Sequence, residues 1–373
     1  MIKKYKRTHT GWMRRTSRVY LNEVNQSKAD KLKKFLVQYQ NIVNYCIVRF
    51  WSAQDFSKKL ADKDITTDTQ ERFNITARLS QCACKQAKET ICSQIGLSKR
   101  KKRMPRFTSH IAHLDSRFVT IEPFKGCFDM CLKFQSGVPN VLIPFNLTGH
   151  SNKFKNNRWD LSKSIRLGYD KFKGLFVDLI FEKEKPLKKQ EGKLIGIDRG
   201  YNCMLVSSDG QEIGKDLKEK IKKAGKRRKT WQHYITTEEN RCLKKLNIDN
   251  IKEIVLENLK NVKMNKRGKF SRNMNRLLSF WHYAKVGKRL TQICEENGTR
   301  ISLKSPYKTS QRCAVCGNID RRNRNGERFL CLRCGHVDNA DYNASKNLEL
   351  LGLAGVYSLR SLPSSFMDVN KYL

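Results

Sequence analysis

Residues 194–213 read LIGIDRGYNCMLVSSDGQEI, and this stretch decides the fold of the C-terminal half of the chain. Leu194 to Ile197 is a short apolar strand, and Asp198 ends it. A second strand follows before the Asp-Gly pair at 209–210, which is typical of a hairpin turn. The stretch therefore predicts a β-hairpin whose first strand presents a carboxylate at its end. An isolated Asp at such a place is also common as a turn or capping residue.

A second acidic residue follows another apolar strand. In the stretch IKEIVLENL, the residues Ile254, Val255 and Leu256 have the character of a buried parallel strand, and Glu257 stands at its end. A carboxylate is costly to bury unless it is paired or bound to a metal ion. Taken alone, Glu257 could equally face solvent at the end of the strand.

The third candidate carboxylate belongs to the stretch HVDNADYNASKNLELLG. Ala344, Leu348 and Leu351 recur there on one helical face, so Asp341 is expected in the first helical turn or just before it. A capping or helix-dipole role would also explain an Asp at this place, and Asp338 competes for either role.

Four of the thirteen cysteines lie in CAVCGNIDRRNRNGERFLCLRCG as two closely spaced pairs, Cys313 with Cys316 and Cys331 with Cys334. Each pair presents two thiolates to one ion, and the two pairs complete a tetrahedral shell. A shell of four thiolates leaves no position for water, so we expect one structural zinc ion. His336 is a poor substitute ligand because it is so near Cys334. The other nine cysteines are scattered, which is typical of small buried side chains in a reducing compartment.

The N-terminal half changes from helical to strand-like periodicity. Ser27 can cap a helix with Asp30 at the third position, and a second helix is expected from about Thr76 to Ile95. The polar stretch ADKDITTDTQE between these helices is expected to be a loop. From about Arg117 to Glu184, short β-type stretches separated by Gly, Pro and Asn predict a small barrel or sandwich. The stretch KPLKKQEGK then suggests a linker into a new domain.

The charge of the chain indicates its partner. The 76 lysines and arginines exceed the 35 acidic residues, and the net charge of +41 favours binding to a polyanion such as nucleic acid. No run of 18 apolar residues and no secretory signal is present, so we expect a soluble, cytoplasmic protein that does not bind a membrane. Two basic runs are candidate phosphate contacts, namely Lys99, Arg100, Lys101, Lys102 and Arg103, and then Lys226, Arg227, Arg228 and Lys229.

The order of these features is more specific than any one of them. A strand-end Asp, a strand-end Glu, a four-cysteine ribbon and an Asp at a helix start follow one another, with SPYKTSQRCAVCG, CLRCG and ADYNASKNL around the ribbon. This set resembles the C-terminal region of TnpB (OrfB-type) proteins of insertion sequences and of the miniature type V CRISPR effectors related to them. The resemblance covers roughly Leu194 to Leu351. In the N-terminal half it rests on the layout and on the stretch LSQCACKQAKETI.

The resemblance implies an RNA-guided DNA endonuclease of prokaryotes, with a guide RNA from a transposon or CRISPR locus and double-stranded target DNA as partners. It implies an α/β, RNase H-like (RuvC-type) catalytic domain with an inserted zinc ribbon, preceded by a wedge-type β-barrel that carries a helical recognition insert. The expected boundaries are 1–22 and 104–190 for the barrel, 23–103 for the helical insert, 191–311 and 336–373 for the nuclease, and 312–335 for the ribbon.

The resemblance also implies that Asp198, Glu257 and Asp341 are the metal ligands. Two Mg²⁺ ions suit phosphodiester hydrolysis, with Asp198 bridging both ions and each of the other carboxylates holding one. Lys308 and Arg312, together with Arg321, Arg322 and Arg324, are expected either to guide a DNA strand or only to solvate the ribbon.

The interval between Asp198 and Glu257 is shorter than the resemblance leads one to expect, which could alter access to the site. Two alternatives stay open from the sequence. One is an RNA-guided DNA binder without nuclease activity, and the other is a transposase that joins strands by similar metal chemistry.

Overall fold

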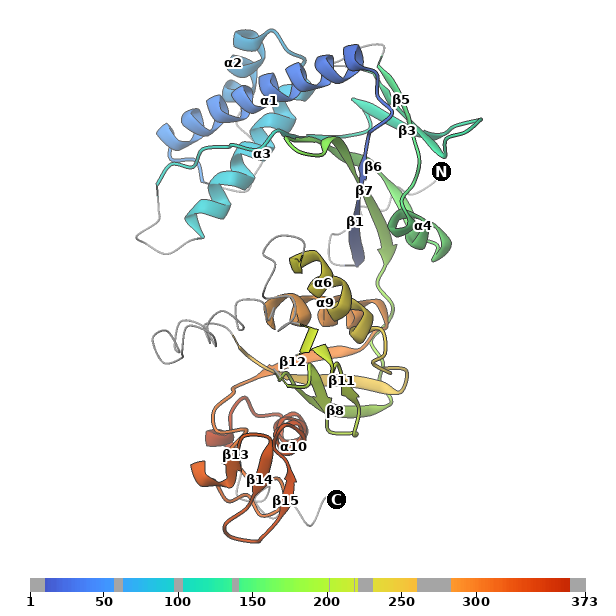
Figure 1. Ribbon diagram of the computed structural model, residues 1–373. Coiled ribbons are helices and arrows are strands. Elements are labelled where there is room, and N and C mark those ends of the chain that lie inside the picture. Colours follow the sequence, from blue (N-terminus) through green and yellow to red (C-terminus); the bar gives the residue numbers. More distant parts are fainter. Residues whose placement is uncertain are drawn as a thin grey trace, which may run out of the picture. The chain divides into compact units, whose positions relative to one another are not determined.

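The computed structural model consists of two compact units, Met1–Glu184 and Lys185–Leu373, each with its own core (Figure 1). The structure describes the following residues: 11–56, 63–96, 103–135, 141–200, 202–217, 219–220, 231–259 and 283–362.

In the part of unit 1 that the structure describes, there are three long helices and one short one. They are α1 (Gln26–Ser52), α2 (Lys63–Phe73), α3 (Ala77–Ile95) and α4 (Gly149–Asn156). The expected second helix is confirmed by α3, but the first helix begins earlier than expected. Its N-cap is Asn25, whose side chain accepts a hydrogen bond from the Lys28 amide, rather than Ser27. Among the helices that the structure describes, none is long and apolar enough to cross a bilayer.

The expectation of a loop between the first two long helices is wrong, because α2 forms there. Its sequence is polar, yet Ile65 and Thr69 lie one turn apart and are both buried. The Tyr45 hydroxyl of α1 donates to Asp68 of α2 at 2.7 Å. Tertiary packing of one narrow face therefore outweighs the polar composition that suggested a loop.

The strands of unit 1 form two antiparallel sheets. The first has the order β1-β7-β6-β2, and the second has the order β3-β4-β5. The strand pattern predicts a small barrel or sandwich, and the resemblance implies a barrel; in the described part of the unit the strands form two separate sheets and no closed barrel. Their bounds are β1 Trp12–Tyr20, β2 Ile111–Leu114, β3 Val119–Pro123, β4 Met130–Phe134, β5 Leu142–Phe145, β6 Asp160–Asp170 and β7 Gly174–Glu184.

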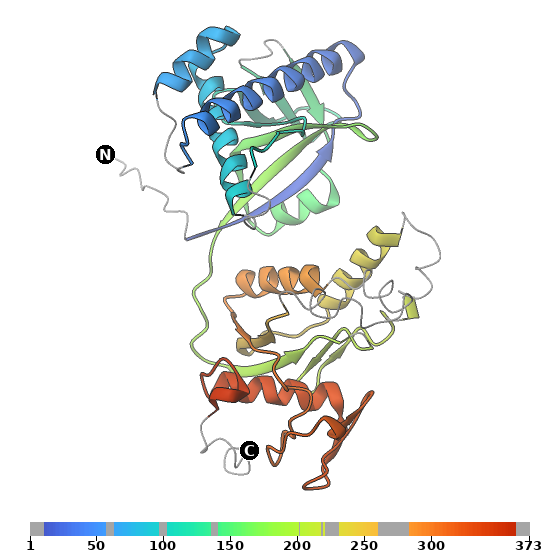
Figure 2. The ribbon, with the colours of Figure 1, turned by 90° about the vertical axis from the view of Figure 1, so that its left-hand side faces the viewer.

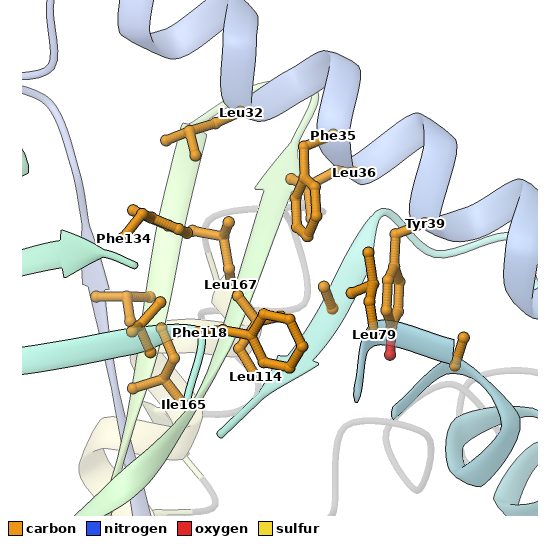
Figure 3. Packing of buried hydrophobic residues seen from close by; sticks show 14 of the residues in the cluster. Leu32, Phe35, Leu36, Tyr39, Leu79, Leu114, Phe118, Phe134, Ile165 and Leu167 are labelled. Atoms are coloured by element: carbon orange, nitrogen blue, oxygen red, sulfur yellow. The ribbon is translucent and has the colours of Figure 1, made fainter. Parts of the chain in front are cut away.

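One continuous core joins the helices and sheets of unit 1. Leu36 of α1 points toward the part of this core that contains Leu167 and Phe118, and Tyr39 of α1 lies beside Leu79 of α3 (Figure 3). Tyr39 keeps its buried hydroxyl satisfied by donating to Gln86 Oε1 of α3 at 3.0 Å. Burial of this apolar face holds α1 and α3 on the sheets.

Unit 2 is built on a mixed five-stranded sheet with the order β10-β9-β8-β11-β12. The first three strands, β8 (Lys193–Asp198), β9 (Leu205–Ser207) and β10 (Glu212–Ile213), form the expected antiparallel hairpin arrangement. The strands β11 (Ile251–Glu257) and β12 (Arg300–Lys304) then add in parallel, with β11 between β8 and β12. The prediction of a central parallel strand at residues 251–257 is therefore confirmed.

Helices cover both faces of this sheet (Figure 2). Alternate residues of β11 point to opposite faces, as in any strand. Ile254 and Leu256 pack with α6 (Trp231–Leu243) and α9 (Tyr283–Glu296), whereas Val255 packs with α10 (Ala340–Leu353).

Two glycines allow α10 to lie directly on the sheet. A Cβ at Gly196 of β8 would overlap the Ser345 carbonyl oxygen of α10. On the helix side, a Cβ at Gly352 would lie 2.5 Å from Val255 Cγ2. This close approach fixes α10 against β8, and therefore fixes where the first turn of α10 lies relative to the strand ends.

The segment before α10 forms a small separate module. It contains the short 3-10 helix η2 (Arg321–Asn323) and a three-stranded sheet of β13 (Arg324–Asn325), β14 (Arg328–Leu330) and β15 (Val337–Asn339). Its buried core is limited to Cys313, Phe329, Cys331 and Ala340. A second 3-10 helix, η3 (Leu359–Ser361), follows α10 and packs under it through Leu359.

Candidate metal centres of the C-terminal unit

The sheet topology brings the first two candidate carboxylates to one edge. β8 and β11 are parallel neighbours, with Ile197 paired to Leu256, so Asp198 and Glu257 follow each other in the same register. Both therefore emerge at the carboxyl ends of adjacent parallel strands. Asp198 is buried, with 8% of its surface exposed, and Glu257 is partly exposed.

The third carboxylate reaches this edge from α10. Asp341 lies in the first turn of the helix, and the Asn339 side chain caps that turn by accepting from the Asp341 amide at 2.9 Å. Because Asn339 is the N-cap, the Asp341 carboxylate is not needed for capping. A Cβ at Gly200 would lie 2.8 Å from Asp341 Oδ2, so this glycine leaves room for Asp341 beside the chain that leaves Asp198.

Asp338, which competed with Asp341 in the sequence, has other partners. It lies 3.4 Å from His336 Nε2 and 4.0 Å from Lys346 Nζ, on strand β15 of the small module.

The three carboxylates influence each other electrostatically. Burial raises the pKa of Asp198 well above its usual range, and the negative charges of Glu257 and Asp341 raise it further. Burial also raises the pKa of Glu257, against the hydrogen bond from Thr309, which lowers it. A site that gathers carboxylates at a buried edge in this way favours a bound cation.

Two side chains hold carboxylates of this edge and a third holds the main chain at Glu257, and the sequence alone does not assign them these roles. Thr309 Oγ1 donates to Glu257 Oε1 at 2.6 Å, and Arg324 Nη2 donates to Asp341 Oδ1 at 2.8 Å. The Arg199 guanidinium donates to the Glu257 carbonyl oxygen. The sequence carried a weak signal only for Arg324, which belongs to the basic cluster of the ribbon.

The donor set of this group suits Mg²⁺, because carboxylate oxygens are the hard ligands that this ion takes in proteins. Among the described residues, the metal-ligating side chains found together as one group are the four cysteines, whose ligand atoms all lie within 4.8 Å of one another.

The four cysteines form a cluster suited to zinc. Cys313 Sγ lies 3.8 Å from Cys334 Sγ, and Cys316 Sγ lies 3.5 Å from Cys331 Sγ. Sulfurs bound to one tetrahedral zinc at about 2.3 Å stand roughly 3.8 Å apart, so the observed separations fit such a shell. The cluster predicted from the spacing is therefore present as a closed set of four sulfur ligands.

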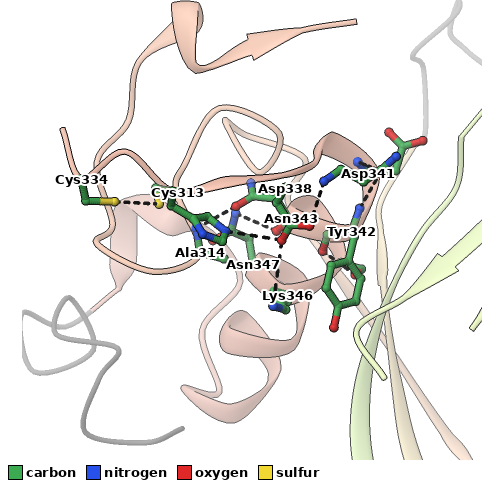
Figure 4. A network of polar contacts seen from close by, with 12 residues as sticks. Cys313, Ala314, Cys334, Asp338, Asp341, Tyr342, Asn343, Lys346 and Asn347 are labelled. Atoms are coloured by element: carbon green, nitrogen blue, oxygen red, sulfur yellow. Dashed lines mark hydrogen bonds and ion pairs between the residues drawn. The ribbon is translucent and has the colours of Figure 1, made fainter. Parts of the chain in front are cut away.

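A buried polar network ties this cluster to α10 (Figure 4). Asn343 Oδ1 accepts from the Ala314 amide at 2.8 Å, and its Nδ2 donates to the Arg312 carbonyl oxygen at 2.8 Å. Asn347 Nδ2 donates to the carbonyl oxygens of Arg312, at 2.8 Å, and of Thr309, at 3.0 Å. Both asparagines are completely buried, so these bonds hold the segment with the first cysteine pair against the helix.

The structure places Arg312 inside this network, although it was expected at a nucleic-acid surface. The side chain is 1% exposed, and its Nη1 donates to the Cys313 carbonyl oxygen at 3.2 Å and to Asn347 Oδ1 at 2.8 Å. A guanidinium buried in this way does not reach a phosphate backbone. The expectation that Arg312 contacts nucleic acid is therefore corrected.

The other candidate nucleic-acid residues divide into described and undescribed ones. Lys99, Arg100, Lys101 and Lys102, and also Lys226, Arg227, Arg228 and Lys229, lie outside the described residues. Arg103 is exposed and lines a groove of about 820 Å³ in unit 1, together with Arg106 and Arg166. Lys308 is exposed, and Lys308 and Arg360 both lie over the ring of Tyr307. These two surfaces are cationic and open to solvent.

Comparisons with known proteins bear on this C-terminal region. Residues 283–348 match the family model described as the Cas12f1-like TNB domain. The chain is 42% identical over 77 residues to the CRISPR-associated endodeoxyribonuclease Cas12f1 of Sulfoacidibacillus thermotolerans, which covers 20% of this chain and 18% of the relative. It is 35% identical over 104 residues to a TnpB-like protein of Aquifex aeolicus, covering 27% of this chain and 33% of the relative.

A comparison of folds extends the likeness. A structure described as the Cas12f1-sgRNA-target DNA complex matches 87% of this chain and 83% of its own chain, with a TM-score of 0.59 and 14% identity. At this identity the likeness concerns the fold. Taken together, the matches confirm the resemblance of the chain to the family of TnpB proteins and miniature type V effectors. The curated relatives are matched over only a third of their length or less.

Proposed function

We propose that this protein is an RNA-guided, metal-dependent DNA endonuclease with a RuvC-type centre made of Asp198, Glu257 and Asp341. The observation that carries the proposal is the convergence of these three carboxylates. They come from the end of β8, the end of β11 and the first turn of α10, and the pKa of each of the first two is raised at this sheet edge. Phosphodiester hydrolysis needs this kind of acidic, metal-binding edge.

The three carboxylates would hold two Mg²⁺ ions, which supply an activated water and stabilise the charge that develops on the leaving oxygen. The charges of both Glu257 and Asp341 act on Asp198, which supports a shared site for the three groups. Thr309 orients the Glu257 carboxylate by donating to one of its oxygens, Oε1. Arg324 does the same for Asp341 through Oδ1.

Arg324 also brings a positive charge to this edge. Its guanidinium lowers the pKa of both Asp198 and Glu257, against the stronger effect of burial. A cation at this place offsets part of the repulsion between the carboxylates and would attract the phosphate of a substrate strand.

The proposed partners are a guide RNA and double-stranded target DNA. The relatives named Cas12f1 are described as endodeoxyribonucleases, and the complex with a similar fold contains a single guide RNA and target DNA. The net charge of +41 supplies the attraction that two polyanions require. The guide would come from the transposon or CRISPR locus that encodes the protein, and the protein would act on the nucleoid in the cytoplasm.

The two cationic surfaces would contact these nucleic acids. In unit 1, Arg103 and Arg106 stand beside polar side chains of α3 in the groove, which suits a phosphate backbone. In unit 2, the Tyr307 ring is flanked by Lys308 and Arg360, a pairing of aromatic and cationic groups suited to a single strand.

Each of the domains expected from the sequence has its own proposed role. Residues 23–103 would recognise nucleic acid, residues 1–22 and 104–190 would form the wedge-type part, and the nuclease would comprise 191–311 and 336–373, with the ribbon at 312–335. The first two parts together correspond to unit 1, and the last two to unit 2, with the division at Lys185.

Plasmid cleavage tests the proposal. Protein purified with its co-expressed locus RNA should cut a plasmid from a target library that matches the guide, and RNA-free protein should bind DNA without preference and leave it intact. Cutting by RNA-free protein would contradict the guided mechanism while keeping the nuclease. Guided binding without any cutting would instead favour a regulator that has lost its activity.

A further inference from the structure

Arg312 is a buried cation without an acidic partner. It is the largest of the fully buried side chains in the described part of the molecule, and no described carboxylate lies within 4.0 Å of it. Its Nη2 has no hydrogen-bond partner, and its Nη1 contacts only the uncharged oxygens of Cys313 and Asn347. A buried charge without compensation is strongly unfavourable, so another source of negative charge is required.

The four-cysteine cluster is that source when it holds a metal ion. Arg312 directly precedes Cys313 and donates to the Cys313 carbonyl oxygen at 3.2 Å, and negative charge on Cys313 and Cys316 favours the guanidinium against the larger, opposite effect of its burial. Four thiolates around one divalent ion carry a net charge of −2, and the S–S separations of 3.5 and 3.8 Å fit such a shell. A metal-loaded cluster therefore compensates the guanidinium, whereas a metal-free cluster of neutral thiols does not.

The same arginine is joined to the carboxylate edge by a short chain of hydrogen bonds. Arg312 Nη1 donates to Asn347 Oδ1 at 2.8 Å, and Asn347 Nδ2 donates to the Thr309 carbonyl oxygen at 3.0 Å. The Thr309 hydroxyl in turn donates to Glu257 Oε1 at 2.6 Å. Arg312, Asn347 and Thr309 are each 1% exposed or less, so water does not replace a lost partner in this network.

We propose that Arg312 is the positioning residue through which the metal-loaded four-cysteine cluster holds Glu257 in place. Its charge is balanced by the cluster, and its guanidinium orients Asn347, which fixes the segment that carries Thr309. Loss of the structural metal then leaves Arg312 uncompensated and loosens the hydrogen bond to Glu257. The part of this inference that concerns Glu257 as a metal ligand rests on the proposed function.

Two metal affinities, measured on the whole zinc-loaded protein, test the inference. The first is the affinity for zinc, from competition with a chromophoric chelator. The second is the affinity for Mn²⁺ as a probe of the carboxylates, from the electron paramagnetic resonance signal of the free ion. Arg312→Met keeps the length of the side chain and removes its charge, and Arg312→Lys keeps the charge. Arg333→Met is the matched control, because Arg333 lies between the two cysteines of the second pair but is exposed.

Arg312→Met should weaken zinc binding ten- to a hundredfold, the usual range for a residue that supports metal ligands, and should weaken Mn²⁺ binding about tenfold. Arg312→Lys should recover part of the zinc affinity, and the control should match the wild type. Thr309→Val should weaken Mn²⁺ binding and leave zinc binding unchanged, since Thr309 lies on the carboxylate side of the network. A role in folding alone would not separate the two affinities in this way.

Wild-type zinc affinity in folded Arg312→Met would overturn the inference, whether or not the protein cuts DNA. If this variant does not fold, Thr309→Val decides, because unchanged Mn²⁺ affinity there breaks the link to Glu257. A wild-type protein that binds zinc but neither binds Mn²⁺ nor cuts DNA would overturn the proposed function together with that link. The zinc affinities would still decide whether Arg312 compensates the cluster.

Discussion

The four-cysteine cluster and the carboxylate group lie in the same unit but are built in opposite ways. All four sulfurs come from 22 consecutive positions, from Cys313 to Cys334, in a module with a very small apolar core. The three carboxylates come from two strands and a helix that span 144 positions, from Asp198 to Asp341. A local site carries its geometry in the sequence spacing, whereas a dispersed site takes its geometry from the sheet and from what packs on it.

This difference explains which parts of the two sites could be predicted. The cluster was predicted in full, because two cysteine pairs of this spacing define the shell by themselves. For the carboxylates, the sequence indicated strand ends and a helix start. Their approach depends on the parallel pairing of β8 with β11 and on Gly196, which lets α10 lie on the sheet. Neither the pairing nor the close approach has a local signal.

The supporting residues were missed for a related reason. Thr309 and Asn347 are ordinary polar residues in the sequence, and only the folded chain shows that they are buried and joined to Glu257 and Arg312. The residue type predicts a surface cation at Arg312, because arginines are usually exposed. The polar sequence of α2 predicts a loop, because the one buried face of this helix is only two residues wide. In each case tertiary context outweighs what the residue type suggests.

The largest expected effect is on the cleavage rate, when one carboxylate of the group is removed. In RNA-loaded protein, Asp198→Ala should lower the rate of target cleavage at least about a thousandfold, because it would remove a ligand of the proposed metal site. Binding to the matched target should stay within a few-fold of wild type. Asp209→Ala is the control, because Asp209 lies in the hairpin turn and bonds to Ser207 and Gln211 instead. Equal rates for the Asp198 variant and the wild type would exclude this site.

Breaking the four-cysteine cluster should have a smaller but broader effect. Metal analysis of the wild type should give about one zinc per chain, and Cys316→Ser should lose it and leave the ribbon open to limited proteolysis. The reason is that the apolar core of the module is too small to hold it without the metal. Cys127→Ser, at an exposed cysteine, should change neither result. A protease-resistant ribbon without zinc would refute the structural role.

Charge outside both centres should set the salt dependence of binding. Log K for duplex DNA should fall linearly with log salt, by roughly 0.9 for each phosphate neutralised, and Lys308→Ala should reduce this slope by about one. Lys215→Ala is the control, because Lys215 is already paired with Glu212. Binding that does not change between low and moderate salt would show that the basic surfaces are not the binding faces.

A smaller effect is expected on the pH dependence of stability, because the carboxylates repel one another. The folded protein raises the pKa of Asp198 above its unfolded value, so the folded state binds this proton more tightly. The resulting contribution to stability is present at acid pH and is lost as the pH rises through the raised pKa. Asp198→Asn does not titrate. In metal-free protein it should therefore raise the melting temperature by a few degrees at neutral pH, and by less near pH 4.

Added Mg²⁺ provides the control for that measurement. It should raise the melting temperature of the wild type, because it binds the folded carboxylates, and should have little effect on Asp198→Asn. A variant that is less stable than the wild type at neutral pH without metal would contradict the repulsion between Asp198, Glu257 and Asp341.

The most direct test of the central claim is the dependence of guided cleavage on a divalent ion. RNA-loaded wild-type protein and a plasmid that carries the matching target should be incubated with Mg²⁺, or with a chelator that removes Mg²⁺ but is too weak to strip zinc from the four-cysteine cluster. We expect the target to be cut only when Mg²⁺ is present, and to be bound in both conditions. Cleavage that continues at the same rate in the chelator would contradict a metal-dependent centre at Asp198, Glu257 and Asp341.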